Sequence, residues 1–328
     1  MHLTLGPILF HWPTRQWADF YARIADEAPV DRVVVGEVVC AKREPFQRPV
    51  LEQVVERLQA AGKEVMRASL ALPTLPRERQ ELARLVEGRL LVEINDLTAL
   101  RFLRREARFA VGPLVNVYNE STLRLLARRG AIRLCLPPEL PLPSIEHLAA
   151  EARTLGVDIE LWAFGRVPLA ISGRCYHARL SGRSRDSCLL VCGRDADGLT
   201  VTTLDGEPIF ALNGVQTLSA AWANLAGDVD ILAKVGVSGL RLSPHSCDMV
   251  AVARIFRAVC DGRWTAEEAL ASLAELVPGV RFANGALAGM AGASWQLRST
   301  ARAGLEPRNP DRPAATRVPA RPLPGREG

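Results

Sequence analysis

The sequence predicts an α/β protein of the (β/α)8-barrel (TIM-barrel-like) class. Short apolar segments recur along the chain, and most are followed by a stretch with helical periodicity. The connections between them are short and often contain a glycine where a helix would end, as at Gly62 and Gly130. The eight predicted strands cover residues 3–9, 32–35, 65–71, 90–95, 109–115, 132–136, 159–164 and 239–243.

The stretches between these strands carry apolar residues at helical spacing. We expect helices over residues 14–28, 50–61 and 121–129. In the last of these, Leu123, Leu126 and the neighbouring Leu125 are expected to mark an apolar face, with three arginines opposite: Arg124, Arg128 and Arg129. A doubly wound open sheet is the alternative architecture, because closure of a barrel cannot be seen in a single sequence.

The regular alternation breaks once, between residues 166 and about 230. This stretch contains a predicted β-hairpin, with strands over 200–203 and 209–212 and a turn at Asp205-Gly206. We interpret it as a cysteine-bearing insertion at the mouth of the barrel, before the last βα unit. Residues 1–299 are expected to form a single domain. Residues 300–328, rich in Pro and Arg, are expected to be a disordered tail.

Composition and charge are those of a soluble protein with no need for a polyanionic partner. The net charge is +5, but residues 301–328 hold six Arg and three acidic residues, so 6 − 3 = +3 lies in the tail. Nucleic-acid binding is therefore not expected. No stretch reaches the roughly 18 apolar residues of a membrane span, and no secretory signal is recognisable at the N-terminus, so we expect a cytoplasmic protein.

Four of the seven cysteines form a candidate metal site. Cys175, Cys188 and Cys192 lie close in sequence in the insertion, and Cys40 follows the predicted strand 32–35. Ligands of parallel α/β proteins gather at the carboxyl ends of strands, so the four sulfurs could converge there. The spacing favours an iron–sulfur cluster, with tetrahedral zinc or purely structural cysteines as alternatives. Three cysteines are expected to serve packing only: Cys135, Cys247 and Cys260.

Cationic and polar side chains accompany these cysteines. Arg174 and Arg179 flank Cys175, and Arg183 and Arg185 precede Cys188; such neighbours would lower the thiol pKa and offset the charge of four sulfurs. Further residues that follow predicted strands or the cysteines, and are candidates to line the same cavity, are Glu37, Lys42, Arg43, Asn116, Tyr118, Asn119, Glu139, His177 and His245. Walker, H-E-x-x-H and G-x-S-x-G motifs do not occur.

A series of short motifs in a fixed order resembles the collagenase-like peptidase superfamily. The resemblance runs from the N-terminus to about residue 259. Its carriers are Leu5-Gly6-Pro7, Trp12-Pro13, residues 36–43, Asn116 with Tyr118-Asn119, Pro138-Glu139-Leu140, residues 165–169, residues 174–179, residues 212–217 and Arg241-Leu242-Ser243-Pro244.

Within this superfamily the chain is similar to the iron–sulfur subunits of oxygen-independent ubiquinone biosynthesis. The resemblance implies a [4Fe–4S] cluster on Cys40, Cys175, Cys188 and Cys192. It also implies a heterodimer with a UbiU-like sister subunit, a ubiquinone precursor as the molecule hydroxylated, and prephenate as oxygen donor. Relatives carry an additional cysteine just before the last ligand, where this chain has Val191. Peptidase activity is not expected.

Two other functions are compatible with the same residues. One is a prephenate-dependent RNA hydroxylase of the same superfamily, which would need a basic groove for phosphates. The other is a zinc-stabilised binding subunit without chemistry of its own. The catalytic residues beyond the cysteines are not identifiable from the sequence.

Overall fold

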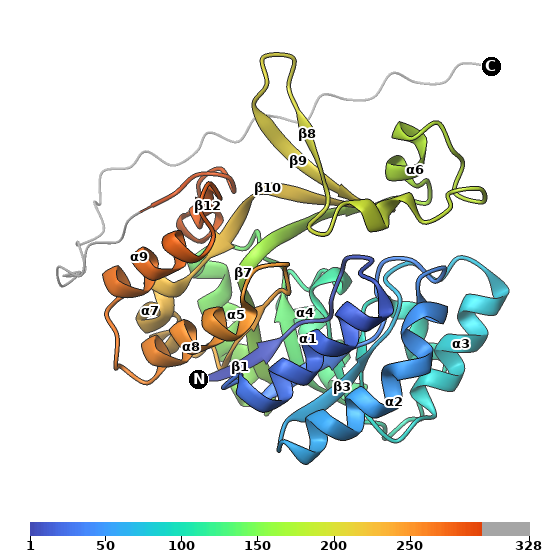
Figure 1. Cartoon of the computed structure of the whole chain (residues 1–328). Coiled ribbons are helices and arrows are strands. Elements are labelled where there is room, and N and C mark those ends of the chain that lie inside the picture. The colour runs from blue at the N-terminus through green and yellow to red at the C-terminus, as the bar shows by residue number, and fades with distance from the viewer. Residues whose placement is uncertain (297–328) are drawn as a thin grey trace, which may run out of the picture. The chain divides into compact units, whose positions relative to one another are not determined.

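Eight parallel strands form a closed barrel. The computed structural model describes residues 1–296, and the barrel strands lie in the order β1–β7 followed by β11. Strands β1, β3 and β7 of this barrel are labelled in Figure 1. Strand β11 pairs in parallel with both β7 and β1, which closes the ring. This confirms the predicted (β/α)8 class and excludes an open sheet. The strands are β1 (His2–Leu5), β2 (Arg32–Val35), β3 (Glu64–Ala68), β4 (Leu91–Ile94), β5 (Phe109–Val111), β6 (Ala131–Leu136), β7 (Asp158–Ile171) and β11 (Gly239–Leu242).

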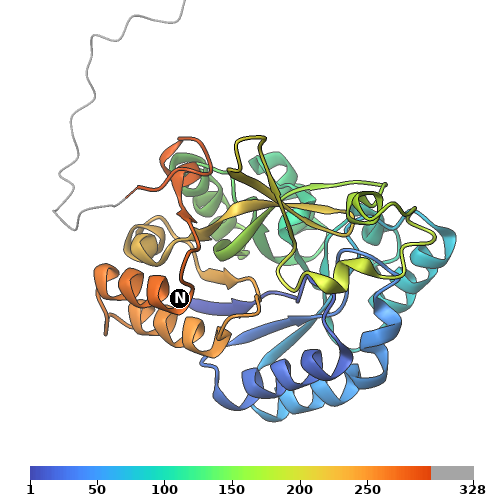
Figure 2. The same ribbon diagram turned by 45° about the horizontal axis from the view of Figure 1, so that its top comes forward.

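Helices surround the barrel, as Figure 2 shows. They are α1 (Thr14–Glu27), α2 (Glu44–Ala60), α3 (Pro76–Val86), α4 (Glu120–Arg128), α5 (Leu142–Thr154), α7 (Val229–Lys234), α8 (Met249–Cys260) and α9 (Ala266–Leu276). The main apolar core lies between their inner faces and the strands. Helix α2 begins six residues before the predicted start. Its first turn contains Pro45, where the missing N–H is not needed, and a second proline, Pro49, lies inside the helix.

The predicted insertion lies at the carboxyl ends of the strands. It contains the short helix α6 (Tyr176–Leu180), a 3-10 turn η3 (Val191–Arg194), and strands β8 (Leu199–Thr202), β9 (Pro208–Asn213) and β10 (Gln216–Asn224). Strands β8 and β9 form the predicted antiparallel hairpin, which projects at the top of Figure 1. Strand β7 runs to Ile171, well past the predicted end, because its second half pairs with β10.

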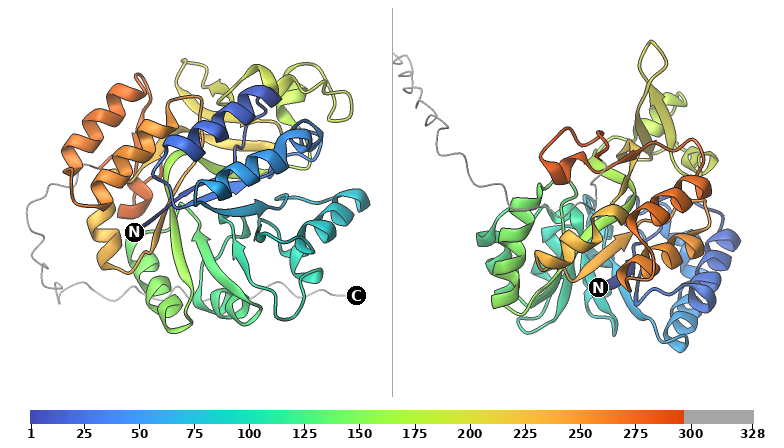
Figure 3. Two further views of the ribbon diagram at one scale, coloured as in Figure 1. Left: turned by 60° about the horizontal axis from the view of Figure 1, so that its bottom comes forward. Right: turned by 90° about the vertical axis from the view of Figure 1, so that its left-hand side faces the viewer.

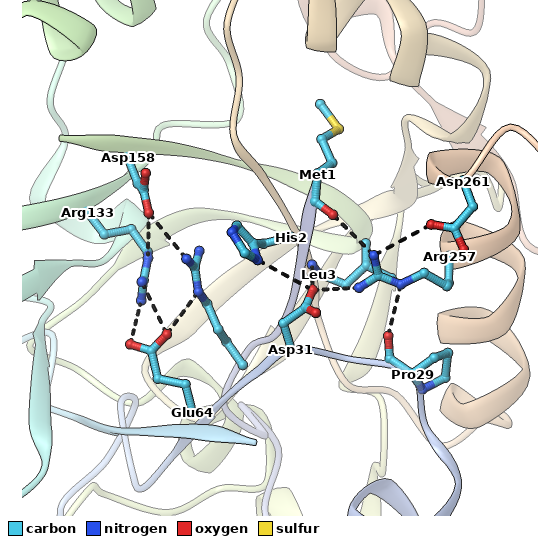
Figure 4. Close-up of polar contacts among 11 residues, drawn as sticks. Met1, His2, Leu3, Pro29, Asp31, Glu64, Arg133, Asp158, Arg257 and Asp261 are labelled. Carbon is cyan, nitrogen blue, oxygen red and sulfur yellow. Dashed lines mark hydrogen bonds and ion pairs between the residues drawn. The ribbon is translucent and has the colours of Figure 1, made fainter. Parts of the chain in front are cut away.

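The amino ends of the strands are closed by ion pairs. Arg133 lies within 3.3 Å of Glu64 and 3.8 Å of Asp158, and the two carboxylates also pair with Arg32. Beside them Arg257 of α8 pairs with Asp31 at 2.5 Å (Figure 4). The N-terminus lies at this end, which faces the viewer in the left view of Figure 3. The amino end of the barrel is thus filled by structural side chains, and a ligand has to be sought at the other end or outside the ring.

The described residues belong to one compact unit. After α9 the chain adds a short strand β12 (Phe282–Ala283), which pairs with β10, and the turn η5 (Gly285–Ala288). None of the described helices is long and apolar enough to cross a membrane. The predicted tail, residues 300–328, lies outside the described residues.

Candidate functional site

The four predicted cysteine ligands line one small cavity. Cys40 comes from the loop after β2, Cys175 stands at the start of α6, and Cys188 and Cys192 bracket the entry into η3. All seven cysteines of the chain are free thiols. Within residues 1–296 no group of three or more His, Cys, Asp or Glu side chains is arranged to hold a metal ion. The tertiary structure therefore gathers the predicted set around a common space without a preformed ion-binding geometry.

The loop that carries Cys40 is organised around a buried carboxylate. Glu37 is 5% exposed, and its Oε1 accepts hydrogen bonds from the backbone N–H groups of Val39 at 2.8 Å and Cys40 at 3.0 Å. Its Oε2 accepts a bond from Gln47 Nε2 at 3.0 Å. Burial raises the pKa of Glu37, while Arg43 and these hydrogen bonds act in the opposite direction. The carboxylate holds the backbone of Cys40 in one position.

Arg43 supplies a buried cation beside the cysteines. Its side chain is fully buried, with Nη1 donating to Leu9 O at 2.7 Å and Nη2 donating to Asn213 Oδ1 at 2.8 Å. Burial lowers the pKa of Arg43, but the negative charges of Glu37, Cys192 and Cys40 outweigh this effect and raise it. Its Nε is buried and has no hydrogen-bond partner in the described part of the chain. The guanidinium also interacts with Cys192 through a side-chain hydrogen bond, so the cation lies directly beside that sulfur.

The insertion is tied to the loop after β2 by hydrogen bonds from the side chain of Lys42. Lys42 Nζ donates to the carbonyl oxygens of Arg185 at 2.7 Å and Asp186 at 3.2 Å, directly before Cys188. After Cys188 the chain turns back through two residues with left-handed backbone, Leu189 and Leu190. These contacts bring Cys188 and Cys192 to the side of the cavity where Cys40 lies.

Gly214 and Asn213 explain how the guanidinium of Arg43 can pack closely at the cavity. Gly214 also lines it, and a Cβ at this position would lie 2.6 Å from Arg43 Nη2, so only glycine lets the guanidinium approach. The adjacent Asn213 both accepts from Arg43 and donates to Leu9 O at 2.7 Å. Asn213 and Gly214 were not among the predicted site residues, although they belong to a motif of the family resemblance.

Two of the thiols at this site, Cys40 and Cys175, have a raised pKa. Burial raises the pKa of Cys40 and of Cys175, and Arg43 opposes this at both thiols without cancelling it. Among the four arginines predicted to act on the sulfurs, Arg185 lines the cavity. The other three are exposed and do not line it: Arg174, Arg179 and Arg183. At Cys175 the expected lowering of the thiol pKa by flanking arginines is outweighed, because desolvation is the larger effect.

Several predicted companions of the cysteines lie elsewhere. Lys42 and Arg43 line the cavity as predicted. Glu37 does not line it, but its carboxylate accepts a hydrogen bond from the backbone N–H of Cys40. Tyr118 bonds through its hydroxyl to Glu139, away from the cysteines, and Asn119 caps the start of α4. Residues Asn116, Glu139, His177 and His245 do not line the cysteine cavity. Strand ends around a barrel point to the same face, but they are spread around its rim, and sequence order does not tell which of them meet.

The two candidate histidines are held by protein groups. His177 Nε2 lies 2.9 Å from Asp195 Oδ2, and the ring is 2% exposed. His245 Nε2 accepts a hydrogen bond from the backbone N–H of Arg166 at 3.3 Å, and its Nδ1 lies 3.0 Å from Ser243 O. Cys135 is buried inside the fold, and Cys247 and Cys260 pack against the main core. These placements agree with structural roles.

The donor set fits an iron–sulfur cluster in its chemistry. Four thiols from two segments face one space, and a buried arginine and a lysine offset the negative charge that four thiolates would bring. The residues that would hold such a group are Cys40, Cys175, Cys188 and Cys192. A comparison with models of known protein families matches residues 16–284 to peptidase family U32.

Proposed function

The chain belongs to peptidase family U32, and from this premise we propose that it is a UbiV-like iron–sulfur subunit rather than a peptidase. In this proposal it acts with a UbiU-like sister subunit in oxygen-independent hydroxylation of the aromatic ring of a ubiquinone precursor. The observation that carries the proposal is the convergence of Cys40, Cys175, Cys188 and Cys192 on one cavity.

A [4Fe–4S] cluster held by these four cysteines would supply one-electron transfer, since four protein ligands leave no iron open to substrate. The chain's own residues prepare the site for such a group. Arg43 and Lys42 neutralise charge at the cavity, and Glu37 fixes the backbone of Cys40. Cys175 and Cys192 are at most 9% exposed, whereas Cys40 and Cys188 are partly exposed. Prephenate as oxygen donor and the ring substrate follow from the family resemblance alone.

The cofactor is tested by metal analysis on protein purified without oxygen. We expect about four irons and four acid-labile sulfides per chain, with loss of both after Cys→Ala replacement of Cys40, Cys175, Cys188 or Cys192. Cys247→Ala and Cys260→Ala are matched controls, because these thiols lie outside the cavity and should leave the iron content unchanged. One zinc and no iron would contradict the proposal and favour a zinc-stabilised subunit.

The activity is tested in cells that depend on this chain for anaerobic ubiquinone. Cys175→Ala should abolish quinone formation without oxygen and leave quinone formation in air intact, whereas Cys260→Ala should retain both. Unchanged anaerobic quinone in the Cys175→Ala strain would sink the ubiquinone assignment. Loss of a modified RNA base in that strain would point to the RNA hydroxylase instead.

A further inference from the structure

A second cavity, about 1000 Å³ in volume, lies apart from the cysteines. Its walls come from the loop after β6, the second half of β7, strands β9 and β10, and the segment from α9 to the end of the described chain. Apolar side chains from all of these line it, among them Leu140, Leu169, Phe210, Ala221, Leu287 and Trp295. Leu169 is 51% exposed and Phe210 is 40% exposed, although both are large apolar residues. The cavity is thus a concave apolar surface left open to solvent.

The charged side chains at its rim already have partners. Glu139 accepts a hydrogen bond from the hydroxyl of Tyr118. Arg281 lies 3.4 Å from Glu207, and it donates to Pro208 O at 2.7 Å. Each carboxylate at the rim therefore has a donor and the guanidinium has acceptors. The rim carries two carboxylates, Glu139 and Glu207, against the one guanidinium of Arg281, so its charge balance disfavours an acidic ligand.

The uncharged polar groups are also largely committed. Ser219 Oγ accepts from the backbone N–H of Val167 at 2.8 Å and lies 2.5 Å from Ala221 O. Asn284 is held by Gln296 through two hydrogen bonds, at 2.8 Å and 3.0 Å. Trp162, which also borders the cavity, differs: its Nε1 is buried and has no hydrogen-bond partner within residues 1–296. An indole N–H only donates, so a ligand that reaches it would be bound through an acceptor atom.

We propose that this cavity binds a neutral small molecule with a long hydrocarbon portion and at most an uncharged oxygen-bearing head. Its volume lies at the upper end of the range of roughly 300–1,000 Å³ for small-molecule sites. The apolar walls favour burial of hydrocarbon, and the two carboxylates and single guanidinium at the rim disfavour an acidic head. Because walls from several elements enclose it, the site suits an elongated small molecule better than a flat protein face.

Binding is tested on the full-length protein with Nile red as a neutral fluorescent probe. The probe should show saturable fluorescence at about one site per chain, and 1-dodecanol should displace it. Dodecanoate, which differs only in its charged head, should displace it at least about ten-fold less well. Equal displacement by alcohol and acid would overturn the neutral-head assignment, and probe binding without saturation would overturn the site itself.

Two substitutions locate the bound probe. Ala220→Trp adds a large side chain at a half-exposed wall position and should weaken Nile red binding at least about ten-fold. Phe210→Ser removes an apolar wall and should weaken it by a similar factor, which keeps the test valid if the first variant misfolds. Leu125→Ser is the matched control, because Leu125 is also exposed and apolar but lies on α4 outside the cavity. Equal weakening by Leu125→Ser would overturn the location.

This inference goes beyond the cysteine site and does not rest on it. A chain that lacks iron but binds 1-dodecanol at this cavity would refute the proposed function and leave the cavity assignment standing. A chain with a full cluster but no saturable probe binding would refute the cavity assignment and leave the proposed function standing.

Discussion

His245 shows at the scale of one residue how the fold selects a protonation state. The ring is 1% exposed, its centroid lies 3.8 Å from that of the tilted Trp222 ring, and both its nitrogens are in hydrogen-bond contact with backbone groups. Since the N–H of Arg166 can only donate, Nε2 has to accept, and the proton of the neutral ring belongs on Nδ1, facing Ser243 O. Burial is the largest cause that lowers the pKa of His245 to about 4, the charge of Arg166 adds to it, and Asp197 acts against it.

The pH dependence of stability follows from this shift. The unfolded chain binds a proton at His245 near pH 6.5, and the folded chain only near pH 4. Between these values the unfolded state holds more protons, so the free energy of unfolding should fall as the pH is lowered, by up to about 3 kcal/mol. Urea unfolding from pH 7 to pH 4 should show a smaller fall for His245→Gln than for the wild type. His147→Gln, at an exposed position, should keep the wild-type slope; equal slopes in all three proteins would contradict the assignment.

At the scale of the element, β7 joins the barrel to the insertion. Its first half pairs with β6 and β11, and its second half pairs with β10. The change of partner coincides with Gly165, which has a φ of +101°. A Cβ there would lie 2.7 Å from Cε1 of His245. Glycine is therefore needed at position 165 both for the positive φ and because a side chain would clash with His245. It permits the single strand β7 to pair in the barrel and in the insertion.

Gly165→Ala should destabilise the protein strongly. Positive φ and the contact with His245 each disfavour a side chain, so we expect a loss of about 3 kcal/mol in the free energy of unfolding. Gly206→Ala is the matched control, since Gly206 has a φ of +90° with nothing within 4 Å of the added Cβ. Strain alone should make that loss about 1 kcal/mol. Denaturant unfolding compares the two, and equal losses would mean that contact with His245 contributes nothing.

At the scale of the whole molecule, a buried ion network spans the interior of the closed barrel. Arg241 on the closing strand β11 donates to Glu160 of the neighbouring β7 at 2.5 Å and to Glu93 of β4 at 3.0 Å. All three side chains are at most 2% exposed. Because β4 and β11 are not neighbours in the sheet, the contact with Glu93 crosses the barrel. The charges hold the closing strand in register with the far wall.

Removing Arg241 alone should lower the free energy of unfolding far more than removing all three charged groups of the network. Arg241→Met leaves two buried carboxylates without a counter-ion and should lower the free energy of unfolding by about 3–5 kcal/mol. Adding Glu93→Gln and Glu160→Gln to that variant should recover part of the loss, because the buried charges are then gone. Arg124→Met removes an exposed ion pair and should change stability by less than about 1 kcal/mol. Denaturant unfolding measures all three, and a loss in Arg241→Met no larger than in Arg124→Met would refute the role of the network.

Sequence reasoning reached the fold because the signals for it are local. Each barrel strand was found from its apolar run, and the hairpin from Asp205-Gly206 with apolar residues on both sides. Errors lie at the ends of elements. Strand β5 ends at Val111 and not at residue 115, because Pro113 begins a 3-10 turn, and β7 is extended by pairing with β10. Such pairing is a long-range contact that no local pattern contains.

The sequence by itself determined the alternation of strands and helices, the position of the insertion and the set of four candidate cysteines, since these depend on periodicity and on spacing along the chain. The closure of the predicted (β/α)8 barrel was decided by the pairing of β11 with β1 and β7. Only the tertiary structure decided that Arg43 is the buried cation beside the sulfurs, that Glu139 and Tyr118 lie elsewhere, and that a large apolar cavity exists between β7, β10 and the segment after α9. The reason is that burial, charge pairing and cavities arise where segments distant in sequence meet. How strongly a charged or ionisable group is affected depends on how far it is removed from water, and the order of residues does not reveal this.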